Sequence, residues 1–258
     1  MRTMLCGVLA LSAPAFPRAA SADAPRAELA VTDSLLAGID QAYLNRHLGN
    51  NLENSNSALL RLREAQPRNP ALLWRLGRGL HAKGRARLDP REKLQAFKEG
   101  ETALAASITA RPGDAEAHYW LARIAAAQNE ILRTLHLTKV MRAELETALR
   151  LNANHGGAHH LLGELLRQLP GSFGGDKRKA VAELEEAVRL EPDDSSHYPA
   201  LAEAYLAVAD KPRAVTTARK AFAITTPADP GGFESDLKDA RDLLRRLGAP
   251  ETESSSPG

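Results

Sequence analysis

The chain has 258 residues, of which 43% are apolar and 26% charged, a balance typical of a protein with a folded core. Aromatic residues make up only 4%, which argues against a stacking surface for single-stranded nucleic acid. Ala, Leu, Arg and Glu predominate, and Val, Ile and Thr form no alternating run, so the composition predicts helices and no sheet.

Residues 1–22 differ from the rest of the chain. Arg2 precedes an apolar stretch over residues 4–11, and the segment ends Ala-Ser-Ala before Asp23. This pattern is typical of a signal peptide, so we expect export across the inner membrane to a periplasmic or extracellular location. The alternative is a disordered N-terminus. The apolar stretch is too short to span a bilayer and no later stretch is long enough, so no integral membrane segment is expected.

The predicted leader also bears on disulfides and charge. It contains Cys6, the only cysteine, so no disulfide is expected in the mature chain. The whole chain has 34 basic and 32 acidic residues, a formal net charge of +2, and loss of Arg2 and Arg18 leaves a net charge of zero. A neutral chain has no bulk charge that would attract nucleic acid or an anionic membrane.

The remaining chain repeats a helical pattern. Large residues recur at positions 0 and +3, and in most copies at +7, with Gly or Ala at +4; the copies begin at Leu73, His118, His159 and Tyr198. This spacing places one small and several large side chains on one helix face, and we call these side chains the stripe. The small residue lets a neighbouring helix approach closely. A second helix follows in each copy and ends near a proline in most, because proline interrupts a helix. A weaker copy begins near Ile39.

This pattern resembles the tetratricopeptide repeat (TPR), whose frame has a large–large–Gly first helix and a proline after the second. The resemblance covers about residues 36–228. It implies an all-α, right-handed solenoid of about five helix pairs with a C-terminal capping helix. The expected boundaries are a leader over 1–22, a linker over 23–35, units over 36–69, 70–114, 115–155, 156–194 and 195–228, a cap over 229–248 and a disordered tail over 249–258.

The predicted units are longer than the usual 34 residues. Their first stripe residues, at 39, 73, 118, 159 and 198, are 34, 45, 41 and 39 positions apart. The predicted end of each second helix always lies six positions before the next first stripe residue. The additional 11, 7 and 5 residues are therefore expected in the turn inside each unit. The stretch "LPGSFGGD" at 169–176 is predicted to be such a turn, with Asp176 as the cap of the next helix. The alternative to a simple flexible turn is that Phe173 covers the groove mouth or inserts into a partner.

The stretch over residues 156–192, "GGAHHLLGELLRQLPGSFGGDKRKAVAELEEAVRLEP", is also similar to the T-component (TatT-like) proteins associated with bacterial TRAP transporters. That similarity covers about residues 95–210. It implies a periplasmic accessory that holds a small ligand for a transporter binding protein. Hardly any apolar sequence precedes Cys6, so a lipid anchor is not expected.

The residues one position beyond the buried stripes should face the concave side of the solenoid, because each step rotates the side chain by about 100°. In two consecutive units an aromatic residue is followed one turn later by Arg, which can hold a carboxylate or an extended acidic peptide. The alternative is an ordinary solvated face. The predicted partner-binding residues are Trp74, Arg78, His81, Tyr119, Arg123, His160, Glu164 and Arg167.

No arrangement of side chains indicates a catalytic site, so we expect neither an enzyme nor a cofactor. His155 and His159 have the spacing of two metal ligands on a helix, but no Glu lies between them and glycines follow His155. His118 and His159 instead fill the aromatic position of the repeat, and no metal site is expected. The "GSFGGDK" stretch lacks the Gly-Lys-Ser/Thr ending of a phosphate loop.

The expected function is a non-catalytic scaffold that binds a peptide or protein segment in its concave groove. The transport accessory is the alternative, and an envelope assembly factor is a third possibility. A scaffold would capture a protein partner, whereas an accessory would carry a small molecule.

Overall fold

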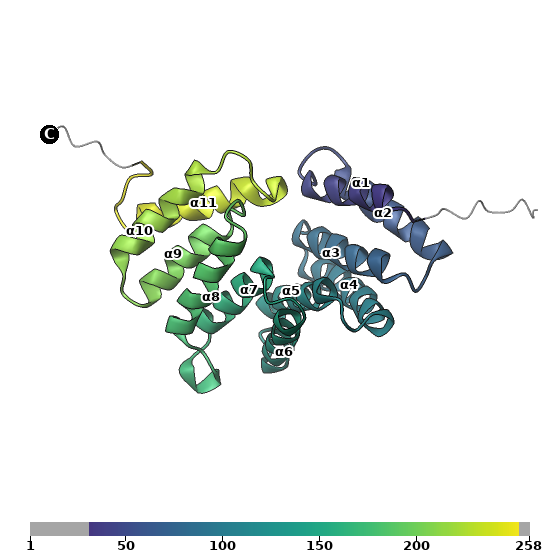
Figure 1. The fold of residues 1–258 in the computed structure, drawn as a ribbon, viewed down its shortest axis with the longest axis horizontal. Helices are drawn as coiled ribbons and strands as arrows, with labels where there is room; N and C mark the ends of the chain where they lie inside the picture. The colour runs from purple at the N-terminus through teal and green to yellow at the C-terminus, as the bar shows by residue number, and fades with distance from the viewer. Residues whose placement is uncertain (1–30, 253–258) are drawn as a thin grey trace, which may run out of the picture. The chain divides into compact units, whose positions relative to one another are not determined.

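The computed structural model describes residues 31–252, and within them the chain forms helices and turns but no strand (Figure 1). The prediction of an all-α fold is confirmed. The predicted leader, residues 23–30 of the linker and residues 253–258 of the tail lie outside the described residues. The helices are α1 (Asp33–Leu44), α2 (Asn51–Ala65), α3 (Pro70–Arg85), α4 (Pro90–Ala110), α5 (Ala115–Leu132), α6 (Leu135–Leu151), α7 (Gly156–Gln168), α8 (Lys177–Leu190), α9 (His197–Ala207), α10 (Lys211–Lys220) and α11 (Pro230–Arg246), with short 3-10 helices η1 (Gly171–Phe173) and η2 (Ala221–Ala223).

The helices pack as consecutive antiparallel pairs, and the first helices of successive pairs, α3, α5, α7 and α9, also contact one another. The stripe forms the core: Leu162, Leu184 and Tyr205 are buried. Inside a pair the small +4 residue allows close contact, because a Cβ on Gly163 would lie 2.6 Å from Leu184 Cγ. The described part of the chain contains no helix with the length and apolarity needed to cross a membrane.

The first residue of the stripe joins each pair to the turn before it. In three successive pairs its side chain contacts the backbone carbonyl of the residue six positions earlier, at the predicted helix end. The contacts are His118 Nε2 to the Pro112 carbonyl at 3.0 Å, His159 Nε2 to the Ala153 carbonyl at 3.0 Å, and the Tyr198 hydroxyl to the Pro192 carbonyl at 2.7 Å. The constant spacing of six residues thus corresponds to a hydrogen bond in the structure.

The additional length of the second and third predicted units does not lie in their turns, so that prediction is wrong. Only residues 86–89 separate α3 from α4, and only 133–134 separate α5 from α6. The helices are longer instead: α4 has 21 residues and α5 has 18. Helix-forming residues continue the hydrogen-bond ladder there, whereas the stretch 169–176 contains one Pro and three Gly, which interrupt it.

The turn over 169–176 is enlarged, as predicted. It contains η1, and Asp176 accepts hydrogen bonds from the backbone N–H groups of Arg178 and Lys179. Phe173 is 57% exposed at the turn and does not line any of the cavities described below. The alternative that it covers the groove mouth is therefore wrong, and its insertion into a partner stays a prediction.

A pH-dependent contribution to stability is expected from His159. Its Nδ1 lies 2.6 Å from Glu183 Oε2 while its Nε2 faces a carbonyl, so both partners are acceptors and the doubly protonated ring satisfies both. The hydrogen bond with the Glu183 carboxylate raises the pKa of His159. A raised folded-state pKa gives stability that is complete below the unfolded-state pKa of about 6.5 and is lost as the pH rises through the folded-state pKa.

We therefore expect His159→Phe to lower the melting temperature more at acidic pH than at alkaline pH, as measured by circular dichroism. His136→Phe, which replaces an exposed histidine, is the control. An equal loss for His159→Phe at both ends of the pH range would contradict the protonated His159–Glu183 pair.

Candidate functional site

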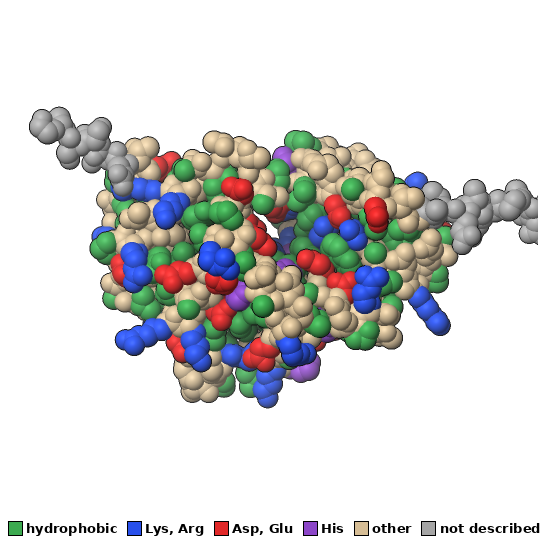
Figure 2. Space-filling model, in the orientation of Figure 1, with side chains coloured by type: hydrophobic (Ala, Val, Ile, Leu, Met, Phe, Trp, Pro, Cys, Tyr) green, Lys and Arg blue, Asp and Glu red, His purple; other side chains and the backbone are tan. Residues whose placement is uncertain are grey.

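The first helices of the pairs surround three adjoining cavities, of about 620, 330 and 440 Å³. The first two share His81, Arg85 and Arg123 in their walls, and the last two share His160 and Glu164. We call this joined space the interior. Figure 2 shows the hollow in the middle of one face of the helical array, with acidic side chains at its rim.

An ion pair between the two ends of the described array closes the interior. Arg46, in the turn after α1, donates to both carboxylate oxygens of Asp229, directly before α11, at 2.5 and 2.6 Å. Both side chains are partly buried, and both line the largest cavity. Figure 1 shows the start of α11 next to α1. The predicted concave groove is thus enclosed on the side where the first and last helices meet.

Two of the predicted binding residues have structural roles. Arg78 is buried, donates to Asp40 Oδ1 at 2.5 Å and lies 4.1 Å above the centre of the Tyr43 ring. The same Asp40 accepts from Arg75, which lies 4.3 Å above the Trp74 ring. These contacts hold α1 against α3. Trp74 lines none of the three cavities.

Arg123 is the guanidinium that remains available inside the interior. Its Nη1 donates to the Tyr119 hydroxyl at 3.0 Å, and the group lies 5.4 Å from the centre of the Trp120 ring. No carboxylate in the described residues lies within ion-pair distance of it. Tyr119 raises the pKa of Arg123, and burial raises the pKa of Tyr119 to about 12, so the cation and the neutral hydroxyl both persist at neutral pH.

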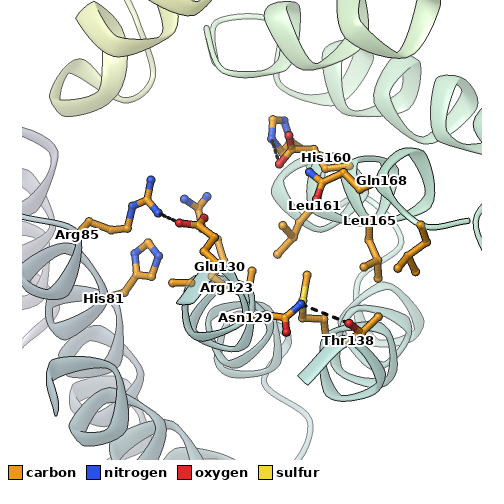
Figure 3. A pocket seen from close by; sticks show the side chains of 15 residues that line it. His81, Arg85, Arg123, Asn129, Glu130, Thr138, His160, Leu161, Leu165 and Gln168 are labelled. Carbon is orange, nitrogen blue, oxygen red and sulfur yellow. Dashed lines mark hydrogen bonds and ion pairs between the residues drawn. The ribbon is translucent and has the colours of Figure 1, made fainter. Parts of the chain in front are cut away.

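His81 adds a neutral ring beside this cation. Burial, and then the charge of Arg123, hold the pKa of His81 well below its usual value. The ring packs 5.6 Å from the Trp120 ring and forms part of the wall of both cavities that Arg123 lines. Figure 3 shows His81, Arg123 and His160 around the second cavity.

The remaining predicted residues form a chain of polar contacts on α7. Glu164 lies 3.6 Å from His160 Nε2 and 3.9 Å from Arg167 Nη2, and His160 Nδ1 lies 2.9 Å from His197 Nδ1. Burial opposes ionisation of Glu164, but the contacts with His160 and Arg167 outweigh it and lower its pKa. Seven of the eight predicted residues therefore line the interior; these are Arg78, His81, Tyr119, Arg123, His160, Glu164 and Arg167.

Sequence reasoning did not identify the acidic wall of the interior. Asp194, Asp229 and Asp236 line the largest cavity, and Asp236, Asp239 and Asp242 line the third. The last three recur every three residues along the polar face of α11, which is the signal that could have indicated this wall. Burial raises the pKa of Asp236 to about 6, against the hydrogen bond that Ser195 Oγ donates at 2.6 Å, and the nearby Asp194, Asp229 and Asp239 raise it further.

One group of side chains in the described residues could hold a metal ion. Ligand atoms of Glu191, Asp194 and the fully buried His197 lie within 4.8 Å of one another. Two of them also have structural hydrogen bonds, because Asp194 accepts from Ser196 and Glu191 accepts from the Gly156 backbone N–H.

His155 and His159, which have the sequence spacing of two metal ligands, do not form a shared site. His155 Nδ1 accepts from the Ala158 backbone N–H at the start of α7, while His159 contacts Glu183. The two side chains therefore have separate structural roles.

Comparison with known proteins identifies the family. The model of the family described as Regulator of microtubule dynamics protein 1-3 matches residues 35–169, which is more than half of the chain. The chain belongs to this family. No curated protein matches it.

Solved structures share the fold. TTC0263, a thermophilic TPR protein of Thermus thermophilus, is 19% identical with a TM-score of 0.60 over 82% of this chain and 97% of that chain. YrrB, a TPR protein with an unusual peptide-binding site, is 17% identical with a TM-score of 0.46 over 80% and 90%. MamA from Desulfovibrio magneticus RS-1 is 18% identical with a TM-score of 0.46 over 85% and 100%. The first likeness confirms a TPR-type fold, and the similarity to T-component proteins finds no support in these matches.

Asp236 should make stability depend on pH. Because its folded-state pKa lies above the unfolded value of about 3.9, its contribution is complete below that value and is lost as the pH rises through about 6. We expect Asp236→Asn to raise the melting temperature relative to the unaltered chain at pH values above the folded-state pKa, and to give little or no gain below the unfolded-state pKa. Asp193→Asn, at a nearby exposed position, is the control. A pH-independent difference for Asp236→Asn would disprove the raised pKa.

Proposed function

We propose that this chain is a non-catalytic interaction module whose interior binds an extended, carboxylate-bearing segment of a partner protein. The observation that carries this proposal is Arg123, a half-buried guanidinium that faces a cavity of about 620 Å³ and contacts one hydroxyl. A guanidinium has five N–H donors, and a charge removed from water is costly unless it is paired. A ligand carboxylate would supply the missing partner through two parallel hydrogen bonds.

The walls around Arg123 favour an extended segment over a simple anion. Tyr43, Tyr119 and Trp120 provide apolar surface beside the cation, and Asp194 and Asp236 provide acceptors elsewhere in the same cavity. A peptide matches both, since it combines a carboxylate with backbone N–H groups and side chains. The ion pair between Arg46 and Asp229 encloses the space, and the cavity is too small for a folded domain.

The predicted leader would place this role in the periplasm or outside the cell. The family name assigns its members a role in microtubule dynamics, and the proposal does not extend that role to an exported chain. The transport accessory differs from the proposed module in its ligand, which would be a small molecule rather than a protein segment.

The test is binding to a library of acidic peptides prepared with free and with amidated C-termini. We expect selected peptides to lose binding about 10- to 100-fold with Arg123→Gln, because hydrogen bonds to charged groups contribute about 1.5–3 kcal/mol. Helix content should stay unchanged. Arg133→Gln replaces an exposed arginine outside the interior and should bind like the unaltered chain.

Two results would count against the proposal. Peptide binding that survives Arg123→Gln would remove the carboxylate site. A small carboxylate found by mass spectrometry in the purified protein, together with no peptide binding, would retain Arg123 as the anion site and replace the protein partner by a small ligand.

A further inference from the structure

The turns inside three successive helix pairs lie along one edge of the array. Because the pairs are antiparallel and α3, α5 and α7 contact one another in order, the turns 86–89, 133–134 and 169–176 follow one another on the same side. Side-chain contacts link neighbouring pairs there: Arg85 Nη1 donates to Glu130 Oε2 at 2.6 Å, and Arg142 Nη2 donates to the Gly174 carbonyl at 3.0 Å. We call residues 85–93, 130–139 and 170–179 the turn edge.

Each of the three turns presents large apolar side chains to water. Leu88 is 94% exposed and Phe173 57%, and Leu132 and Leu135 are each 49% exposed. Leu48 is also exposed, in the turn between α1 and α2. The turns that join one pair to the next, at 66–69, 111–114, 152–155, 191–196 and 224–229, contain none of the exposed large apolar residues, although Leu151 is exposed at the end of α6, directly before one of them. Five of the seven exposed large apolar residues in the described part of the chain lie in or beside turns inside pairs.

Charge follows the same division. The turn edge has nine basic and four acidic residues, a net charge of +5, although the whole chain has +2. Most of these charges lie on the helix ends beside the turns, and the three turns alone are neutral. The joining turns on the opposite edge have two basic and five acidic residues, a net charge of −3. Several turn-edge cations have no carboxylate within ion-pair distance in the part of the chain that the structure describes: Arg91, Arg133, Lys139, Lys177, Arg178 and Lys179.

We propose that the turn edge docks on the surface of an anionic lipid bilayer. Exposed Leu and Phe side chains at the tips would enter the headgroup boundary, and the flanking Lys and Arg side chains would contact lipid phosphates. The glycines on both sides of Phe173 allow its turn to project from the helix pair, while Arg142 fixes that turn through the Gly174 carbonyl.

A bilayer suits this arrangement better than an acidic protein does. The apolar side chains stand on separate turns with basic residues between them, and they form no continuous groove. A protein partner would need a matching pocket for each tip, whereas a fluid lipid surface accommodates separate insertions. Arg85, Glu130 and Thr138 of the turn edge also line the interior, but none of the four exposed apolar side chains does, so substitutions of those four test the turn edge alone.

The experiment is co-sedimentation of the full chain with vesicles of phosphatidylcholine alone and of equimolar phosphatidylcholine and phosphatidylglycerol. We expect binding to the anionic vesicles that weakens as salt is added, and little binding to the neutral ones. Leu88→Ser combined with Phe173→Ser should weaken binding to the anionic vesicles at least tenfold, as should Lys177→Gln combined with Lys179→Gln. The leader is the same in every variant, so these differences report on the turn edge.

Matched controls distinguish binding by the turn edge from nonspecific hydrophobic binding and from binding by the interior. Leu60→Ser combined with Leu151→Ser removes exposed apolar side chains away from the turn edge and should leave vesicle binding unchanged, as should Arg123→Gln. Equal binding to both kinds of vesicle, or equal losses in the Leu60/Leu151 variant, would overturn the proposal. Binding to soluble polyglutamate with the same dependence on Leu88 and Phe173 would assign the edge to an acidic protein instead.

Discussion

The structure depends on the close contact between a small residue on the first helix of a pair and a buried leucine on the second. A Cβ on Gly77 would lie 2.4 Å from Leu104 Cγ, so glycine is what lets α3 and α4 approach this far. Gly163 and Leu184 repeat the arrangement between α7 and α8. Because interiors are close-packed, these contacts fix each pair as a rigid unit, and the stacking of such units positions the side chains of the interior.

The buried helix faces, the hydrogen bonds six residues apart and one enlarged turn can be predicted from the sequence, because each is determined by residues close together in the chain. The stripe identifies the buried faces, and the constant interval of six residues identifies the hydrogen bonds made by His118, His159 and Tyr198. Proline and glycine at 169–176 reveal one enlarged turn. The lengths of α4 and α5 are not predicted correctly, because the additional residues of a long repeat unit can extend either a helix or a turn.

The interior could be predicted only in part, because its geometry is set by contacts between distant segments. One step of helical rotation was enough to place Arg123 and His81 on the inner side. Nothing local shows that Arg78 is engaged by Asp40, 38 residues earlier, or that Arg46 reaches Asp229, 183 residues later. The second of these ion pairs joins the two ends of the array, so it depends on the curvature summed over the helix pairs between them. The acidic face of α11 can be assigned to the wall of the interior only from the structure, which places that helix and Arg123 around the same cavity.

Net charge conceals how this chain distributes its charges. A total of +2 argues against attraction to any polyanion, yet the turn edge, which includes the helix ends beside the turns, carries +5 and the turns between pairs carry −3. Antiparallel pairing places all turns of one kind on the same side, so a charge bias in the helix ends beside those turns becomes a charge difference between the two edges of the array. At physiological ionic strength fields from exposed charges are screened beyond about 8 Å. A surface approaching one edge therefore experiences the charge of that edge and not the sum over the chain.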